Sequence, residues 1–361
     1  MKKILVLGAT GSIGSSTLDI ARNMKDDFKI VGISANKSKS KAEQIKKEFG
    51  CEATLFSDDG IDGIKKIIDK TKPDIVVNGI SGSAGLEPSC IVLENSIDLA
   101  LANKETVVMA WPLIKSLAEK KGAKIIPVDS EHSAVFCLIN QCGRENIDEI
   151  IITASGGPFR NYTKEQLKNV TLEDALNHPT WNMGPKITID SATLANKGLE
   201  VIEATRLFDM DTKHVKVVVH PQSFVHSIVR TNDGMLYAQI SDPDMKHPIF
   251  QSLVYPENKK NYLKPFDLFD KELQFYKPRY DDFPMLSYAY EAAEKNGGYT
   301  IAFNAANEIA VAAFTERKIG FTDIQHVTQK TLEKDFTMSP ESFEDVLEID
   351  RTARKIAGEL V

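Results

Sequence analysis

Cysteine is scarce: the 361-residue sequence contains only Cys51, Cys90, Cys137 and Cys142. These positions form no CxxC pair and give no disulfide framework for this length, so we expect reduced, mostly buried thiols in a reducing compartment. Long apolar runs are also missing, because the first one ends at Gly8 without a cleavage-site pattern, and none approaches the roughly 18 residues of a membrane span. These absences predict a soluble, cytoplasmic protein without a membrane partner.

An excess of positive charge is absent as well. The formal net charge at pH 7 is -7, which argues against a general nucleic-acid-binding surface, although a local basic pocket remains compatible with it. The shares of hydrophobic residues, 42%, and charged residues, 26%, are ordinary for a globular protein, so a disordered chain is not expected. The length predicts two or three domains.

The first third of the chain alternates short apolar runs with helical patterns. Strands are expected at residues 4–7, 29–34, 53–56, 75–78, 98–102 and 124–128. Helical patterns between them include 15–23, 39–49 and 111–121. Because the expected strands are almost uninterruptedly apolar, the pattern predicts an α/β fold, a parallel sheet covered by helices on both faces.

From about residue 147 the pattern changes. Strands cluster at 149–153, 215–219, 224–230 and 235–240, which predicts an α+β domain with an open sheet. Residues 256–284 are rich in Pro, Lys and Asp and are expected to form a linker. Only helical patterns follow, and they predict a C-terminal helical bundle over 284–295, 300–317, 321–336 and 343–360.

The first expected strand leads into Gly8, Gly11 and Gly14, and a helix follows. Glycines there allow a tight turn and a close backbone approach to a pyrophosphate, which the helix N-terminus would bind. This GxxGxxG run predicts a dinucleotide site; a glycine-rich turn without a ligand is the alternative. Residues 35–39, after the second strand, hold two lysines and no acid for a ribose 2′-hydroxyl, which favours NADPH unless these lysines only begin a solvated helix.

Two carboxylates, Asp129 and Glu131, follow the sixth expected strand. Ligands of parallel sheets bind at the carboxyl ends of the strands, so both groups could hold one hard cation such as Mg²⁺ or Mn²⁺. Glu200 could complete the set from a helix face that it shares with Lys197, whose ammonium would reach a phosphate. The alternatives are a solvated acidic turn and a polar helix start capped by Asp190 or Ser191.

Two further segments carry ligand-binding chemistry. The glycine-rich turn at 154–159 (ASGGPF) could present backbone N–H groups and Ser155 to an anion. The loop at 178–184 (HPTWNMG) contains Trp181 and Met183 without a regular period. Large apolar side chains are costly to expose in a loop, so we interpret it as a lid. Simple packing of both side chains on the core is the alternative.

Together these segments resemble the 1-deoxy-D-xylulose 5-phosphate reductoisomerase family of the non-mevalonate isoprenoid pathway. The matching runs span nearly the whole chain: GATGSIG (8–14), LANKE (101–105), PVDSEHS (127–133), ASGGPF (154–159), HPTWNMG (178–184), IDSATLANKGLEVIEA (189–204), HPQSFVHS (220–227) and NAANE (304–308). The resemblance implies a homodimer. Its parts would be an NADPH-binding Rossmann-like domain at 1–122, a catalytic and dimerisation domain with the lid at 123–255, a linker at 256–284 and a helical domain at 285–361.

The resemblance also implies roles for single residues. One ion of Mn²⁺, Mg²⁺ or Co²⁺ would be held by Asp129, Glu131 and Glu200. The phosphorylated sugar would contact Ser155, His178, Trp181, Ser191, Asn196 and Lys197. Lys104 and Ser130 would lie nearer its reacting carbons, and Glu131 and Glu200 would also contact it. The catalytic residues would be Lys104, Asp129, Glu131 and Glu200. The cofactor would contact Gly8, Thr10, Gly11, Ser12, Ile13, Asn36, Lys37, Ser38, Asn103, Glu105 and Gly184.

The implied reaction rearranges the carbon skeleton of 1-deoxy-D-xylulose 5-phosphate and reduces the product with NADPH to 2-C-methyl-D-erythritol 4-phosphate. A short-chain dehydrogenase would need Tyr and Lys at positions i and i+4 of a helix. Only Tyr255 and Lys259 have this spacing, and Pro256 follows the tyrosine in the expected linker, so that alternative fails. A non-catalytic NADPH-sensing regulator remains the second alternative, but it would have no use for three metal-binding carboxylates.

Overall fold

The computed structural model describes residues 1–361, and the chain divides into two compact units. Unit 1 consists of Met1–Thr106, Pro112–Ser133 and Asp244–Pro265. Unit 2 consists of Val107–Trp111, Ala134–Pro243 and Phe266–Val361. The division into four functional parts that the sequence suggests stays a prediction. None of the helices combines the length and the apolar character that crossing a membrane requires.

Unit 1 is built on a six-stranded sheet in which every neighbouring pair of strands is parallel. The strands are β1 (Lys2–Leu7), β2 (Phe28–Ala35), β3 (Glu52–Leu55), β4 (Ile75–Asn78), β5 (Asp98–Leu101) and β6 (Ile125–Pro127). Their order is β3-β2-β1-β4-β5-β6, which is the order of a Rossmann sheet. All four residues of β4 are buried. The predicted parallel sheet is confirmed.

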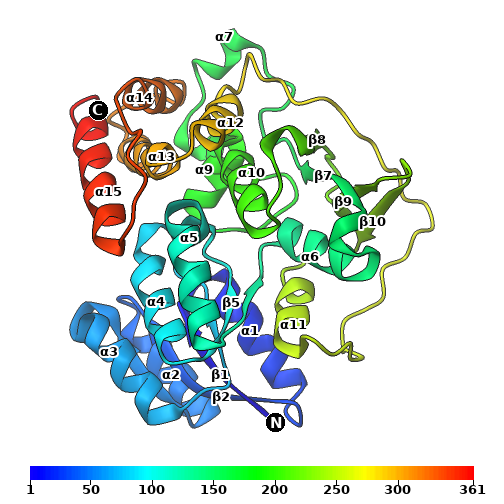
Figure 1. Ribbon diagram of the computed structural model, residues 1–361, viewed down its shortest axis with the longest axis vertical. Helices are drawn as coiled ribbons and strands as arrows, with labels where there is room; N and C mark the ends of the chain where they lie inside the picture. Colours follow the sequence, from blue (N-terminus) through cyan, green and yellow to red (C-terminus); the bar gives the residue numbers. More distant parts are fainter. The chain divides into compact units, whose positions relative to one another are not determined.

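Helices connect these strands and cover the sheet (Figure 1). They are α1 (Ser12–Asn23), α2 (Lys39–Phe49), α3 (Phe56–Thr71), α4 (Leu86–Glu94) and α5 (Lys104–Lys121), with α11 (Lys246–Val254) returning to pack against α1. Helix α5 is kinked at the non-helical residue Ala110, so its second segment begins at Trp111, where the sequence predicts a helix. The first segment, from Lys104 to the kink, was not predicted, and Pro112 lies in the first turn after the kink. Proline at this point removes an N–H group and distorts the preceding turn.

Unit 2 contains a four-stranded sheet in the order β10-β9-β7-β8. The strands are β7 (Ile147–Ala154), β8 (Val215–Val219), β9 (Val225–Thr231) and β10 (Leu236–Ile240). Only the β7–β8 pair is parallel, so the predicted α+β arrangement is confirmed. The helices along this part of the chain are α6 (Ser130–Cys142, which begins in unit 1), α7 (Lys164–Leu167), α8 (Leu172–Leu176), α9 (Pro185–Thr193) and α10 (Ala195–Leu207). Of these, α10 contacts β7 and β8 of the sheet.

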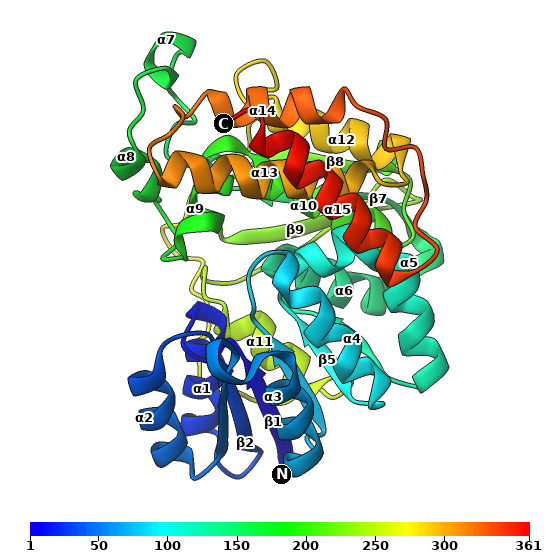
Figure 2. The same cartoon turned by 90° about the vertical axis from the view of Figure 1, so that its left-hand side faces the viewer.

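The last part of unit 2 is the predicted helical bundle. It consists of α12 (Met285–Lys295), α13 (Tyr299–Thr315), α14 (Asp323–Leu332) and α15 (Phe343–Gly358). Figure 2 shows α13 between α14 and α15, and α12 contacts α13 as well. The preceding segment, 256–284, has neither helix nor strand. Tyr276 nevertheless pairs with Val219, and Phe275 stacks on His220 with ring centroids 4.8 Å apart, so part of this segment packs on the sheet.

Candidate active site

The strand order of unit 1 reverses between β1 and β4, which is where Rossmann sheets bind their ligands. Gly8 follows β1 with φ +78°, and a Cβ atom there would lie 2.9 Å from the Gly79 carbonyl oxygen that follows β4. A Cβ atom on Gly14 would lie 2.4 Å from the Ala9 Cα. No side chain fits at either position, so the glycines bring α1 close to the strand. No side chain caps α1 at Gly11, so no capping side chain competes with an anion for the first N–H groups of this helix.

The end of β2 lies beside this loop. The N–H groups of Gly8 and Ala9 donate to the Ser34 carbonyl at 3.1 and 2.8 Å. The exposed residues after β2 are Asn36, Lys37 and Ser38. The glycine loop and the lysine-containing end of β2 are therefore neighbours, as a site for a 2′-phosphorylated dinucleotide requires.

Asn103 and Glu105, two predicted cofactor residues, are buried at the start of α5. The Asn103 amide donates to the carbonyls of Ile80 and Gly82, at 2.8 Å each, and to the Glu105 carboxylate at 2.9 Å. Its own oxygen accepts from the Thr106 N–H. These contacts hold the loop after β4 in place. Within unit 1, Asn103 thus shapes the loop at the strand ends.

The acidic pair lies after β6, as predicted. Asp129 is buried and forms an ion pair with Lys104. Burial by itself would raise the pKa of the Asp129 carboxyl, but the Lys104 ammonium and the His132 ring outweigh it and hold that pKa well below its usual value. Glu131 is half-buried and accepts a hydrogen bond of 2.6 Å from the Ser130 hydroxyl. An ionised Asp129 and a neighbouring carboxylate are what a hard cation requires.

His132 lies beside the pair of carboxylates Asp129 and Glu131, and the sequence assigned it no role. It is fully buried, and its Nδ1 lies 3.8 Å from an Asp129 oxygen. The signal was its spacing: His132 follows Asp129 by three residues at the start of α6, so one helical turn brings the two side chains together.

In unit 2, three segments converge on His178. Its Nε2 lies 3.0 Å from the Ser155 hydroxyl, which follows β7, and 3.1 Å from the Ser191 hydroxyl on α9. The Gly157 N–H also donates to Ser155, at 3.2 Å. Gly156 and Gly157 have φ of +81° and +67°, conformations that favour glycine. Three of the predicted phosphate-binding residues are therefore brought together.

The protonation of His178 follows from its surroundings. The backbone N–H groups of Thr180 and Trp181 both donate to Nδ1, at 3.1 and 2.9 Å. Burial, with the nearby Arg160 cation, lowers the pKa of His178 to about 4. At neutral pH the ring is therefore uncharged with Nδ1 as an acceptor, so its proton lies on Nε2 and points at the two serines. Arg160 is a second contributor to this site that the sequence analysis did not identify.

This shift predicts how acid affects unit 2. The folded-state pKa of His178 is below the ordinary value of 6.5, so the neutral form stabilises the fold fully above that value, and the stabilisation is lost as pH falls towards 4. We expect a decrease from pH 7 to 5 to cost the wild type about 1 kcal/mol more than His178→Gln, after allowing for partial exposure. Urea titrations at both pH values measure it. Equal losses would show that His178 does not titrate in this way.

Helix α10 carries three further predicted residues of unit 2. Asn196 donates to one Glu200 oxygen at 2.6 Å, and Lys197 forms an ion pair with the other. Glu200 is fully buried. The predicted shared face of Lys197 and Glu200 on one helix is confirmed. The alternative of a helix start capped by Asp190 or Ser191 is wrong: both lie in the last turns of α9, and α10 begins after Leu194, whose φ is +63°.

The segment 178–184 lies outside helices and strands. Trp181 is half-buried, and its ring meets the His226 ring edge-on at 6.1 Å. His226 in turn contacts the Ser241 hydroxyl at 2.9 Å. Trp181 therefore packs on unit 2, while Gly184 is exposed and forms the N-cap of α9. A closing movement of this segment stays a prediction.

The Rossmann sheet with its glycine loop and the polar clusters at Asp129 and His178 define a dinucleotide-dependent enzyme. Family models of the reductoisomerase match most of the chain. The model described as 1-deoxy-D-xylulose 5-phosphate reductoisomerase matches residues 4–59 and 56–111, and models of its C-terminal domains match 125–208 and 240–356. The chain belongs to the 1-deoxy-D-xylulose 5-phosphate reductoisomerase family, which confirms the resemblance.

Relatives and solved structures agree with this assignment. Reductoisomerases from Treponema denticola and Treponema pallidum are 50% and 46% identical, each over 99% of this chain and 96% of their own length. A crystal structure of DOX-P reductoisomerase in complex with NADPH, fosmidomycin and magnesium has a TM-score of 0.92 at 37% identity, covering 100% of this chain and 98% of that one. The Zymomonas mobilis enzyme in complex with NADPH has a TM-score of 0.88 at 37% identity, covering 99% and 98%.

Proposed function

We propose that this chain converts 1-deoxy-D-xylulose 5-phosphate to 2-C-methyl-D-erythritol 4-phosphate with NADPH and a divalent cation, in non-mevalonate isoprenoid precursor biosynthesis. The observation that carries the proposal is 50% identity to a named reductoisomerase over 99% of the chain. This similarity extends over both units, and therefore over the polar clusters at Asp129 and His178. A non-catalytic NADPH sensor is not favoured, because such a regulator needs the nucleotide fold alone.

The cofactor would bind at the glycine loop of unit 1. The fit rests on Gly8 and Gly14, where any Cβ atom would collide with backbone. The uncapped start of α1 would bind the pyrophosphate, and Lys37 would bind the 2′-phosphate. NADPH supplies the hydride for the reduction. The predicted contacts at Thr10, Ser12, Ile13, Asn36, Ser38 and Gly184 belong to the same proposal.

The cation would be held by Asp129, Glu131 and Glu200. The fit rests on donor chemistry: Asp129 stays ionised beside Lys104, and all three side chains offer the hard oxygen ligands that Mg²⁺, Mn²⁺ and Co²⁺ accept. The bound cation supplies Lewis-acid polarisation of the substrate's ketone and adjacent hydroxyl. Lys104 would balance negative charge on these oxygens, and Ser130 would hold Glu131 through the hydrogen bond described above.

The substrate's phosphate would bind in unit 2. His178 would donate from Nε2, and Ser155 and Ser191, both within 3.1 Å of that nitrogen, would donate from their hydroxyls. Asn196 and Lys197 would contribute an amide and an ammonium group from the start of α10. Binding energy from this non-reacting group would drive closure of the segment around Trp181, which would exclude water from the rearranging carbons.

The enzyme would work as a homodimer in the cytoplasm. Strand β10 is an edge strand whose Leu236 and Tyr237 are 51% and 46% exposed. An exposed apolar edge of this kind is a liability in a monomer and favours pairing with a second copy. All four cysteines are free, which suits a reducing compartment.

The choice of cofactor is testable at Lys37. Replacing this exposed lysine by glutamate puts a negative charge where the 2′-phosphate would lie. For Lys37→Glu we expect KM for NADPH to rise about 10- to 100-fold, with little change for NADH. Initial rates at varied cofactor concentrations measure both, and Lys41→Glu on exposed α2 is the matched control. An unchanged ratio of the two KM values would remove Lys37 from the site.

The function itself is tested by turnover. Purified protein is mixed with 1-deoxy-D-xylulose 5-phosphate, NADPH and Mn²⁺, and the nicotinamide absorbance is followed. We expect oxidation that stops with EDTA and is far slower with NADH. If NADPH binds by fluorescence but is not oxidised, the proposed reaction is wrong and the sensor becomes the better account.

A further inference from the structure

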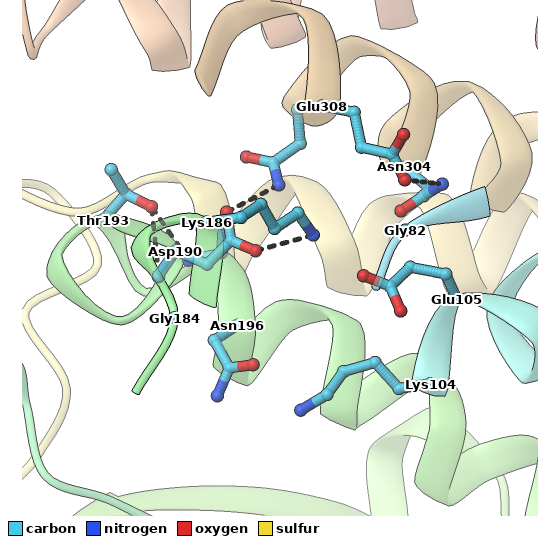
Figure 3. Close-up of polar contacts among 12 residues, drawn as sticks. Gly82, Lys104, Glu105, Gly184, Lys186, Asp190, Thr193, Asn196, Asn304 and Glu308 are labelled. Atoms are coloured by element: carbon cyan, nitrogen blue, oxygen red, sulfur yellow. Dashed lines mark hydrogen bonds and ion pairs between the residues drawn. The ribbon is translucent and has the colours of Figure 1, made fainter. Parts of the chain in front are cut away.

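Asp190 is a buried carboxylate that belongs neither to the proposed metal ligands nor to the proposed substrate-binding residues. It lies on α9 with 1% of its surface exposed. Within unit 2 both of its oxygens have partners (Figure 3). Oδ1 accepts a hydrogen bond of 2.8 Å from the Asn307 amide, and Oδ2 lies 2.7 Å from the Lys186 ammonium. A buried charge requires such partners, because desolvation is costly without them.

The two partners belong to different elements. Lys186 lies one turn earlier on α9, whereas Asn307 lies on α13 and is fully buried in the NAANE run. The next residue, Glu308, is bound by Arg354 of α15 at 2.6 Å. Figure 3 shows Glu308 on the same helix, above α9. The Asp190 carboxylate therefore joins α9 to the central helix of the bundle.

Helix α9 connects two parts of the proposed substrate site. It begins directly after Gly184, where the segment 178–184 ends, and it is followed by α10 with Lys197. Ser191, next to Asp190, contacts His178 at 3.1 Å. The packing leaves little freedom there, because a Cβ atom on Gly157 would lie 2.7 Å from the Ser191 carbonyl oxygen. A shift of α9 would therefore move Ser191 away from its partners.

We propose that Asp190, held by Asn307 and Lys186, is a positioning residue that sets α9 so that Ser191 and His178 meet at the substrate's phosphate. This inference rests on the proposed function of that site. Hydrogen bonds are directional, so the Asn307–Asp190 contact sets the position of α9 along and around its axis more tightly than apolar packing would. The helical bundle thereby contributes to substrate binding through α9.

The test uses Asn307→Leu, which keeps the size of the side chain and removes the donor, in the full-length enzyme. We expect KM for 1-deoxy-D-xylulose 5-phosphate to rise about tenfold or more, with kcat changed less than about threefold and the dissociation constant of NADPH within about twofold. The matched control is Asp350→Asn, which weakens a buried ion pair with Arg354 in the same bundle. It should lower the melting temperature and leave KM unchanged.

A donor–acceptor exchange separates positioning from general stability. Asp190→Asn and Asn307→Asp should each raise KM, and the double variant Asp190→Asn/Asn307→Asp, in which the hydrogen bond can form in reverse, should recover most of the loss. If Asn307→Leu does not fold, Lys186→Gln on the partly exposed side of α9 replaces it, with the same expected direction of change in KM.

Inorganic phosphate separates this inference from the proposed reaction. Binding of phosphate, measured by calorimetry well below the melting temperature, should be weaker in Asn307→Leu than in the wild type and equal in Asp350→Asn. If the protein shows no turnover but binds phosphate in this pattern, the proposed reaction is wrong and the positioning role stands. The positioning role would be overturned if the Asn307→Leu variant folds and keeps the wild-type KM. If turnover is absent, it would be overturned by a folded variant that keeps the wild-type affinity for phosphate.

Discussion

Glu131→Gln is expected to lower kcat by about a thousandfold or more, because Lewis-acid polarisation contributes several kcal/mol of barrier reduction. The change keeps the shape of the side chain and its contact with Ser130. It replaces a carboxylate with a neutral amide two residues after Asp129, whose carboxyl stays ionised. NADPH binding should remain nearly intact, because the glycine loop that would bind it follows a different strand. Steady-state kinetics and NADPH fluorescence measure the two effects.

The matched control for that prediction is Glu119→Gln, the same chemical change at an exposed position of α5. It should leave both quantities unchanged. Near-normal turnover in Glu131→Gln would remove Glu131 as a metal ligand, and a parallel loss of NADPH binding would point to misfolding of unit 1 instead.

Arg206→Met is expected to destabilise unit 2 by about 3 kcal/mol, because it leaves buried carbonyl groups without a donor. Burial lowers the pKa of the Arg206 guanidinium to about 10, so it is still charged at neutral pH. One guanidinium nitrogen donates to the Val107 and Val108 carbonyls at 2.8 and 2.6 Å, and another to the Thr300 hydroxyl at 2.7 Å. In a regular helix the Val108 carbonyl would accept from residue 112, which here is a proline without an N–H group.

Urea unfolding followed by far-UV circular dichroism measures this loss. Arg351→Met is the control, because Arg351 is an exposed arginine on α15 whose surface ion pairs with Glu344 and Glu348 should be worth at most about 1 kcal/mol. If Arg206→Met costs no more than Arg351→Met, Arg206 does not replace the missing hydrogen bond of α5.

Local patterns explain which parts of the fold could be predicted. The strands at 75–78 and 215–219 have the predicted bounds, because short apolar runs bounded by polar residues are distinctive. The predicted helix start at Trp111 coincides with the kink of α5 at Ala110, but the segment from Lys104 was missed. The donor to the Val108 carbonyl before Pro112 is Arg206, a residue distant in the sequence. No local pattern contains that contact.

The same limit applies to the site. The residue types that meet at His178 were visible in the sequence. The proton on His178 Nε2, in contrast, follows from two backbone N–H groups that only the folded loop directs at Nδ1. The contact between Asp190 and Asn307 joins residues 117 positions apart, and neither residue carries a pattern that announces its partner. His132 was within reach of prediction, because its helical spacing from Asp129 is local.

The structure of the product tests the central claim most directly. The protein is incubated with 1-deoxy-D-xylulose 5-phosphate, NADPH and Mn²⁺, and the product is identified by ¹H and ¹³C NMR. Skeletal rearrangement with reduction places the methyl group on a carbon without hydrogen, so we predict a methyl singlet, as in 2-C-methyl-D-erythritol 4-phosphate. A methyl doublet would show reduction of the unrearranged ketone and would contradict the account.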